Sequence, residues 1–155
     1  MKRSAVALAA ALLTACGSGE GSGVEGIVVE GAWARPMAVM AGGPSPSGIH
    51  SAVYLSLRNE GARPDRLVAG EAEMAEAVEI HESRMESGVM RMRPVDGGIR
   101  IPAAGVVELR PGGLHLMLLN LRASLVEGDT LVLSLRFEES GTREVLVPVR
   151  SAGER

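Results

Sequence analysis

Cysteine, aromatic residues and basic charge are all scarce in this sequence of 155 residues. The single cysteine, Cys16, cannot form an intramolecular disulfide, and it excludes Cys-x-x-Cys chemistry. Aromatic side chains make up 2% of the chain, so we expect no stacking platform for single-stranded nucleic acid. The formal net charge of −3 argues against binding to a phosphate backbone. The sequence therefore predicts no nucleic-acid partner.

Catalytic motifs are missing as well. The sequence has no nucleophile–base pair, no two carboxylates at a spacing typical of a catalytic pair and no phosphate-binding loop, so we expect no enzyme activity. Hydrophobic residues make up 46% and charged residues 23%, which is typical of a globular protein. The length is that of one domain. These features favour a binding or carrier protein with a single folded domain.

The N-terminal segment has the features of a bacterial export signal. Lys2 and Arg3 precede the apolar residues 5–13, a run too short to cross a bilayer as a helix. The run leads into Leu-Thr-Ala-Cys, which resembles the lipobox of bacterial lipoproteins. We therefore expect residues 1–15 to be a signal peptide and Cys16 to carry a lipid anchor in the periplasm or cell envelope. An ordinary secretory signal with an incidental cysteine is the alternative.

The remaining chain divides into a tether, a body and a tail. Residues 16–24 are rich in Gly and Ser, which predicts a flexible tether. Residues 25–150 are the expected domain, and residues 151–155 are a short tail. Within the domain, short segments of alternating apolar and polar residues are separated by Gly-rich turns, which is typical of an antiparallel sandwich or barrel. The expected strands are 27–33, 52–58, 78–83, 89–93, 106–109, 114–119, 130–137 and 144–149.

Histidine and methionine gather around a predicted hairpin. His81 and Met85 precede a turn at 86–88, and Met90 and Met92 follow it. A loop at 86–87 would place His81 directly opposite Met92, whereas a loop at 87–88 would place them on a close diagonal. In both registers the four side chains share one face, because side chains alternate along a strand. The hairpin therefore carries one imidazole and several thioethers on a single face.

A second His-Met group lies within residues 114–118. If this segment is a strand, His115 and Met117 point to one face and the three leucines to the other. Should the two groups meet, they would offer two imidazoles and two thioethers. Thioether sulfur is a soft, neutral donor that suits Cu(I) and not Mg²⁺, Ca²⁺ or Zn²⁺, and imidazole also binds copper. A blue-copper centre, which needs a Cys ligand, is excluded because the domain contains none.

The same residues also have ordinary structural explanations. A methionine on a half-buried strand most often fills the core, and a lone histidine is most often hydrogen-bonded. We apply these explanations to Met74 and His50. Four further methionines stay open as additional soft donors or as packing residues: Met37, Met40, Met85 and Met90.

At the His and Met positions the sequence resembles the periplasmic copper chaperone family PCu(A)C. The signature of that family is His, ten residues, Met, about twenty-one residues, then His-x-Met. Here ten residues separate His81 from Met92, and twenty-two separate Met92 from His115-x-Met117. The additional residue can lie in a loop. The resemblance extends over residues 27–149, including Ala-Trp-Ala-Arg at 32–35.

The resemblance implies an all-β fold, a cupredoxin-like antiparallel β-sandwich of Greek-key topology. It also implies that one Cu(I) ion is bound by His81, Met92, His115 and Met117. The implied role is copper delivery to the dinuclear centre of cytochrome c oxidase, with subunit II or another copper chaperone as the partner. We expect a monomer. The alternatives are a copper buffer or resistance lipoprotein and a membrane-tethered β-sandwich that binds protein without metal.

Overall fold

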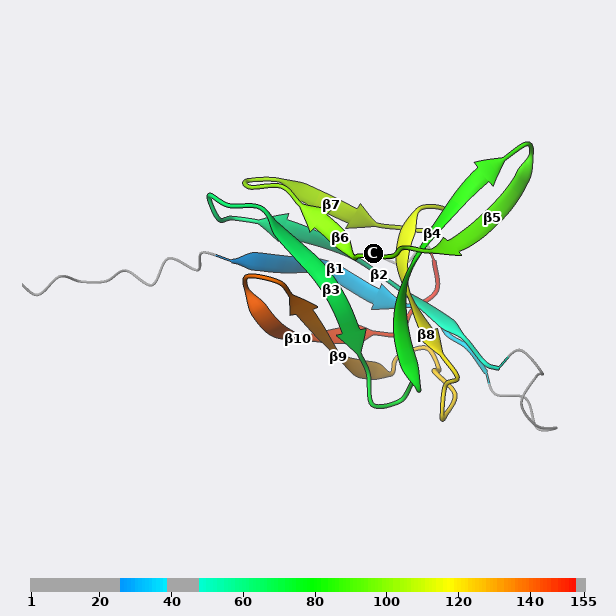
Figure 1. Ribbon diagram of the computed structural model, residues 1–155. Helices are drawn as coiled ribbons and strands as arrows, with labels where there is room; N and C mark the ends of the chain where they lie inside the picture. The colour runs from blue at the N-terminus through cyan, green and yellow to red at the C-terminus, as the bar shows by residue number, and fades with distance from the viewer. Residues whose placement is uncertain (1–25, 39–47, 153–155) are drawn as a thin grey trace, which may run out of the picture.

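The computed structural model describes residues 26–38 and 48–152, and within them every regular element is a β-strand (Figure 1). The signal segment, Cys16 and Met40 lie outside the described residues. No helix among the described residues is long and apolar enough to cross a membrane. The strands are β1 (Ile27–Ala34), β2 (Ser51–Asn59), β3 (Asp65–Glu71), β4 (Ala77–Glu86), β5 (Val89–Pro94), β6 (Ile99–Ile101), β7 (Val106–Leu109), β8 (Leu114–Leu119), β9 (Thr130–Phe137) and β10 (Gly141–Pro148).

The strands form one curled sheet in the order β1-β2-β8-β4-β3-β9-β10, and all the named strands pair antiparallel. Neighbours that are distant in sequence, such as β2 with β8, require crossover connections of the Greek-key kind. The two ends of the sheet meet where Ala34 bridges Val149, and the backbone N–H of Arg150 donates to the Ala34 carbonyl at 3.0 Å. The sheet is thus a nearly closed barrel around one core, which confirms the predicted antiparallel all-β class.

The core is built by residues that alternate along each strand. In β9, Leu133 and Leu135 are fully buried, whereas Val132 between Leu131 and Leu133 is exposed. In β8, Leu116 and Leu118 point into the core. Because side chains alternate, the neighbouring residues of β8 are left for the outer face of the barrel. This alternation is what presents the second predicted His-Met group to a site outside the core.

Eight of the ten strands were predicted from the sequence, and two were missed. The missed strand β3 is rich in Asp, Arg, Gly and Glu, which are weak strand formers, and a bulge between Leu67 and Ala69 breaks its alternation. The missed strand β6 has three residues, too few for a recognisable pattern. Residues 72–76 form turns that lead into β4.

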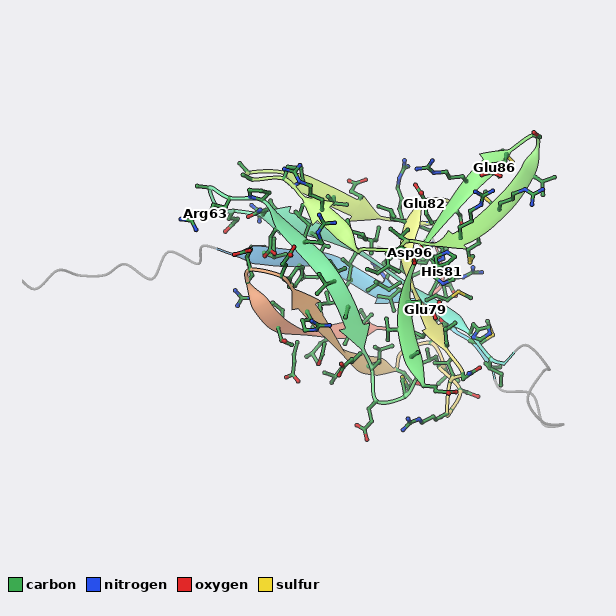
Figure 2. The ribbon with its side chains drawn as sticks, in the orientation of Figure 1. Arg63, Glu79, His81, Glu82, Glu86 and Asp96 are labelled. Atoms are coloured by element: carbon green, nitrogen blue, oxygen red, sulfur yellow. The ribbon has the colours of Figure 1, made fainter. Side chains whose placement is uncertain are left out.

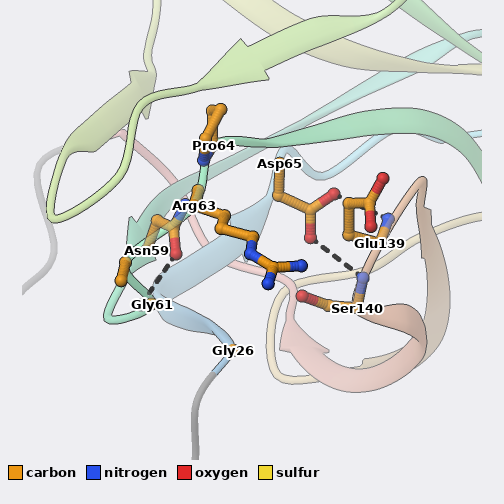
Figure 3. Close-up of a pocket in the computed structure, with 9 residues that line it drawn as sticks. Gly26, Asn59, Gly61, Arg63, Pro64, Asp65, Glu139 and Ser140 are labelled. Atoms are coloured by element: carbon orange, nitrogen blue, oxygen red, sulfur yellow. Dashed lines mark hydrogen bonds between the residues drawn. The ribbon is translucent and has the colours of Figure 1, made fainter.

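A polar pocket of about 520 Å³ lies beside the start of β3 (Figure 3). There the Asp65 carboxylate accepts backbone hydrogen bonds from Arg66 at 2.6 Å, Glu139 at 2.9 Å and Ser140 at 3.0 Å. Burial raises the pKa of Asp65, but the hydrogen bonds from Ser140, Glu139 and Arg66 lower it by more, so the net shift is downward. Asp65 therefore fastens the β9–β10 turn to β3. This pocket contains no thioether or imidazole, so it is not the soft-metal candidate.

Candidate metal centre

The two predicted His-Met groups meet where β4 pairs with β8. His81 lies directly opposite His115 in this register, and their ring centroids are 6.0 Å apart. Glu79 lies opposite Met117. Paired residues of antiparallel strands share a face, so these four side chains lie together on the outer side of the barrel.

The hairpin of β4 and β5 adds Met92 to this face. Ser83 pairs with Met92, and His81 pairs with Pro94. The turn is Ser87-Gly88, where both residues have positive φ, as a two-residue hairpin turn requires. Of the two registers open from the sequence, the one that sets His81 and Met92 on a close diagonal is correct. The hairpin projects beyond the barrel (Figure 1).

A pocket of about 300 Å³ lies on this face. Three of the four predicted ligands, Met92, His115 and Met117, line it. Met37 and Met90 line it too, so it gathers four of the six methionines that the structure describes. The rest of the lining consists of Arg35, His50, Ser51, Ala52, Tyr54, Ser83, Pro111 and Gly112. This concentration of thioethers distinguishes the pocket from the polar pocket at β3.

The fourth predicted ligand, His81, lies beside the pocket and does not line it. Its Nε2 is 2.8 Å from a carboxylate oxygen of Glu79, and both residues are labelled in Figure 2. If Nε2–H donates to this carboxylate, Nδ1 keeps its lone pair. Nδ1 is buried and has no hydrogen-bond partner among the described residues. Such a buried, unpaired atom costs about 1–3 kcal/mol, which a bound ion would offset.

His115 has the opposite ring orientation. It is buried, and its Nδ1 lies 3.0 Å from the Gly113 carbonyl oxygen, which can only accept, so Nδ1 carries the proton. Nε2 therefore keeps a lone pair. Burial lowers the pKa of His115, the hydrogen bond to Gly113 raises it, and the neighbouring His81 lowers it, with a net downward shift. The ring is thus neutral at pH 7, the state that a metal ion requires.

His50 also reaches the pocket, but its ring is bonded differently. The backbone N–H of Asn120 donates to Nδ1 of His50 at 3.3 Å. The Nδ1 lone pair is therefore used, and the proton lies on Nε2. This bonding agrees with the structural explanation given to His50 from the sequence, and it separates His50 from the two candidate ligands.

An aromatic layer supports the floor of the pocket. Trp33 stacks on Tyr54 with ring centroids 4.7 Å apart, and Tyr54 lies 6.2 Å from His115. The guanidinium carbon of Arg150 lies over the Trp33 ring, 5.7 Å from its centroid. Sequence reasoning missed the roles of Tyr54 and Glu79. Strand alternation could have identified Glu79, which precedes His81 by two residues and so shares its face.

The donor set itself restricts the metal. Across residues 26–38 and 48–152, no three His, Cys, Asp or Glu side chains gather closely enough to hold an ion. The side chains that could add to the imidazoles in this pocket are the thioethers that line it. Thioethers suit a soft monovalent ion such as Cu(I) and suit hard divalent cations poorly. The residues present fit copper in its reduced form.

Comparisons with known proteins agree with this fold. A lipoprotein of Leifsonia xyli subsp. xyli named "Putative lipoprotein Lxx21020" is 33% identical over 130 residues, covering 84% of this chain and 73% of that protein. The copper-bound PCuAC domain from PmoF2 superposes with a TM-score of 0.63 at 24% identity, covering 81% of this chain and 92% of that one. The solution structure of CuI-DR1885 from Deinococcus radiodurans gives a TM-score of 0.57 at 27% identity, covering 86% and 85%.

The family is identified by a family model that matches nearly the whole described domain. The family model described as "Putative lipoprotein LpqE-like" matches residues 27–149, a range that contains all ten strands and both His-Met groups. The chain therefore belongs to the LpqE-like family, a relative of the PCu(A)C copper chaperones.

Proposed function

We propose that this protein is an extracytoplasmic, lipid-anchored Cu(I) chaperone that holds one ion through His81, Met92, His115 and Met117. The observation that carries the proposal is the state of the two imidazoles. Each ring has one nitrogen hydrogen-bonded, to Glu79 or to Gly113, which leaves the other nitrogen to bind an ion. Metal-binding histidines are oriented by such secondary hydrogen bonds. The thioethers of Met92 and Met117 complete a neutral donor set.

The proposed mechanism is ligand exchange without any change in oxidation state. Met92 is half exposed, so an incoming donor of a partner can reach the ion from that side. One bond to the incoming donor forms before one bond to a thioether breaks, and the thioether leaves as a neutral group. Nδ1 of His81 is buried, so its ligation requires neighbouring side chains to move aside. His81 would therefore be the last of the four side chains to join the ion during loading.

We propose the dinuclear copper centre of cytochrome c oxidase, in subunit II, as the acceptor, with another copper chaperone as the alternative. The support is the likeness to copper-bound PCuAC domains together with the lipobox-like sequence at Cys16. Anchoring both proteins to one membrane raises their effective concentration, so weak docking suffices. A copper buffer would have the same site and no dedicated acceptor.

The test is an anaerobic Cu(I) titration against a coloured chelator. The wild-type protein should retain one equivalent, and the Met92→Leu/Met117→Leu variant should lose it. Met74→Leu is the matched control, because Met74 lies outside the pocket and packs against the core. Equal chelator competition by all three proteins would reject the metal site and leave a tethered protein-binding module.

A second experiment separates a chaperone from a buffer. Loaded protein is mixed with the soluble copper domain of oxidase subunit II, and the copper content of each protein is measured after separation. Transfer in the absence of chelator supports delivery. Retention of copper by the loaded protein, with an acceptor that takes up free Cu(I), would support the buffer.

A further inference from the structure

Three methionine side chains lie in a row along one face of the projecting hairpin, and the row begins in the pocket. Met92 and Met90 both line the pocket, Met90 two residues nearer the hairpin tip, and Met85 pairs with Met90 across the hairpin. Their exposed fractions are 51% for Met92, 53% for Met90 and 64% for Met85. Half-exposed methionines do not fill a core, so packing does not account for Met85 and Met90.

The spacing of these side chains suits a stepwise movement of a soft ion. Residues two apart on a strand are about 6.5 Å apart along the chain, and directly paired residues have Cβ atoms about 5 Å apart. Methionine side chains have three rotatable bonds, so neighbouring sulfurs can approach the same ion. An ion can thus be shared between Met92 and Met90, and then between Met90 and Met85.

We infer that Met85 and Met90 form an entry and exit path for Cu(I), outside the set that holds the ion at equilibrium. This inference rests on the proposed function and adds residues to it. Each step exchanges one neutral thioether for another, so neither charge nor oxidation state changes. Met85 and Met90 are the most exposed methionines that the structure describes, so their sulfurs would be the first to meet the ion and the last to release it.

A second explanation of the same row is an apolar docking surface for a protein. The two explanations differ in what sulfur contributes. Leucine keeps the apolar area of methionine and removes the thioether donor, so Met85→Leu/Met90→Leu abolishes a metal path and preserves a docking surface. Both positions are more than half exposed, so this double substitution should leave the fold intact.

The experiment measures rates and affinity on the same proteins. Each protein is loaded with one equivalent of Cu(I) and mixed rapidly with excess coloured chelator, and the absorbance gives the release rate. A separate equilibrium titration gives the affinity, and Met74→Leu is again the control. A path requires Met85→Leu/Met90→Leu to slow release several-fold at unchanged affinity, because uptake and release slow together when only a path is lost.

The other outcomes overturn the inference in distinct ways. Wild-type release rates in Met85→Leu/Met90→Leu would reject the path. If affinity fell by the same factor as the release rate rose, Met85 and Met90 would belong to the set of ligands that holds the ion at equilibrium. Failure of the wild-type protein to bind Cu(I) in the equilibrium titration would instead reject the proposed function itself.

Discussion

His81 and His115 occupy directly opposite positions on β4 and β8, and a different ring nitrogen is hydrogen-bonded in each of them. Nε2 is bonded in His81 and Nδ1 is bonded in His115. The bonded groups are a side-chain carboxylate in one case and a backbone carbonyl in the other. Only the first of these can be removed by substitution, which makes Glu79 the direct test of how the site is oriented.

Substitution of Glu79 by Ala should weaken Cu(I) binding by about 10–100-fold, the usual effect of removing a group that orients a metal-binding histidine. Glu79→Gln, which can still accept a hydrogen bond from His81, should retain more affinity. Glu73→Ala, at an exposed position outside the pocket, serves as the control. Affinities are measured by chelator competition. Wild-type affinity in Glu79→Ala would show that the carboxylate does not orient the ligand.

Acid should destabilise the metal-free protein through His115. Its pKa is lowered in the folded state, so the unfolded chain takes up a proton first as the pH falls below about 6.5. The contribution of His115 is therefore present above that pH and lost below it. Urea unfolding at pH 7.5 and pH 5.5 should show a smaller loss of stability in His115→Gln than in the wild type. Equal losses in the two proteins would contradict the burial of a neutral ring.

Asp65 should stabilise the part of the barrel where the β9–β10 turn meets β3. Replacing it with Asn leaves backbone N–H groups of the β9–β10 turn poorly paired, at a cost of about 1–3 kcal/mol at pH 7. Because the folded pKa is lowered, this contribution is present above the ordinary carboxyl value of about 4 and fades as the pH falls through the folded value. Chemical unfolding of Asp65→Asn and of exposed Asp96→Asn, at pH 7 and pH 3, measures the difference. An equal effect of the two substitutions at pH 7 would be incompatible with the capping role.

The fluorescence of Trp33 should report metal binding. It is the single tryptophan of the chain, and it reaches the site through its stack on Tyr54, which neighbours His115. Titration with Ag(I), a redox-stable analogue of Cu(I), should change the emission and saturate at one equivalent. Met92→Leu/Met117→Leu should show no such saturation. Unchanged emission in a protein that binds Ag(I) by calorimetry would mean that the ion lies away from the aromatic layer.

Most of what could be predicted about the site came from the alternation of apolar and polar side chains along the strands. Leu114–Leu119 places His115 and Met117 on one face because Leu116 and Leu118 belong to the core, and the pattern is visible in the sequence. The hairpin face followed from the same period of two, although its register needed the turn geometry at Ser87-Gly88. Local pattern therefore placed the residues on faces.

The local sequence pattern could not predict which strands, distant in sequence, pair with each other. The opposition of His81 and His115 depends on β4 lying beside β8, strands that are separated by three others in the chain. The contact of Trp33 with Tyr54 likewise depends on the pairing of β1 with β2, where the two residues lie opposite each other. The strand β3 escaped prediction because its bulge and its polar residues hide the alternation.

The projecting hairpin leaves one border of β5 unpaired with any other named strand. Such a border is a template on which a second chain can add and begin aggregation. Here it carries Arg91, Arg93 and Pro94, and proline lacks the N–H that a growing ladder needs. The hairpin can thus extend its methionines into solvent while its backbone resists pairing with the edge strand of another copy.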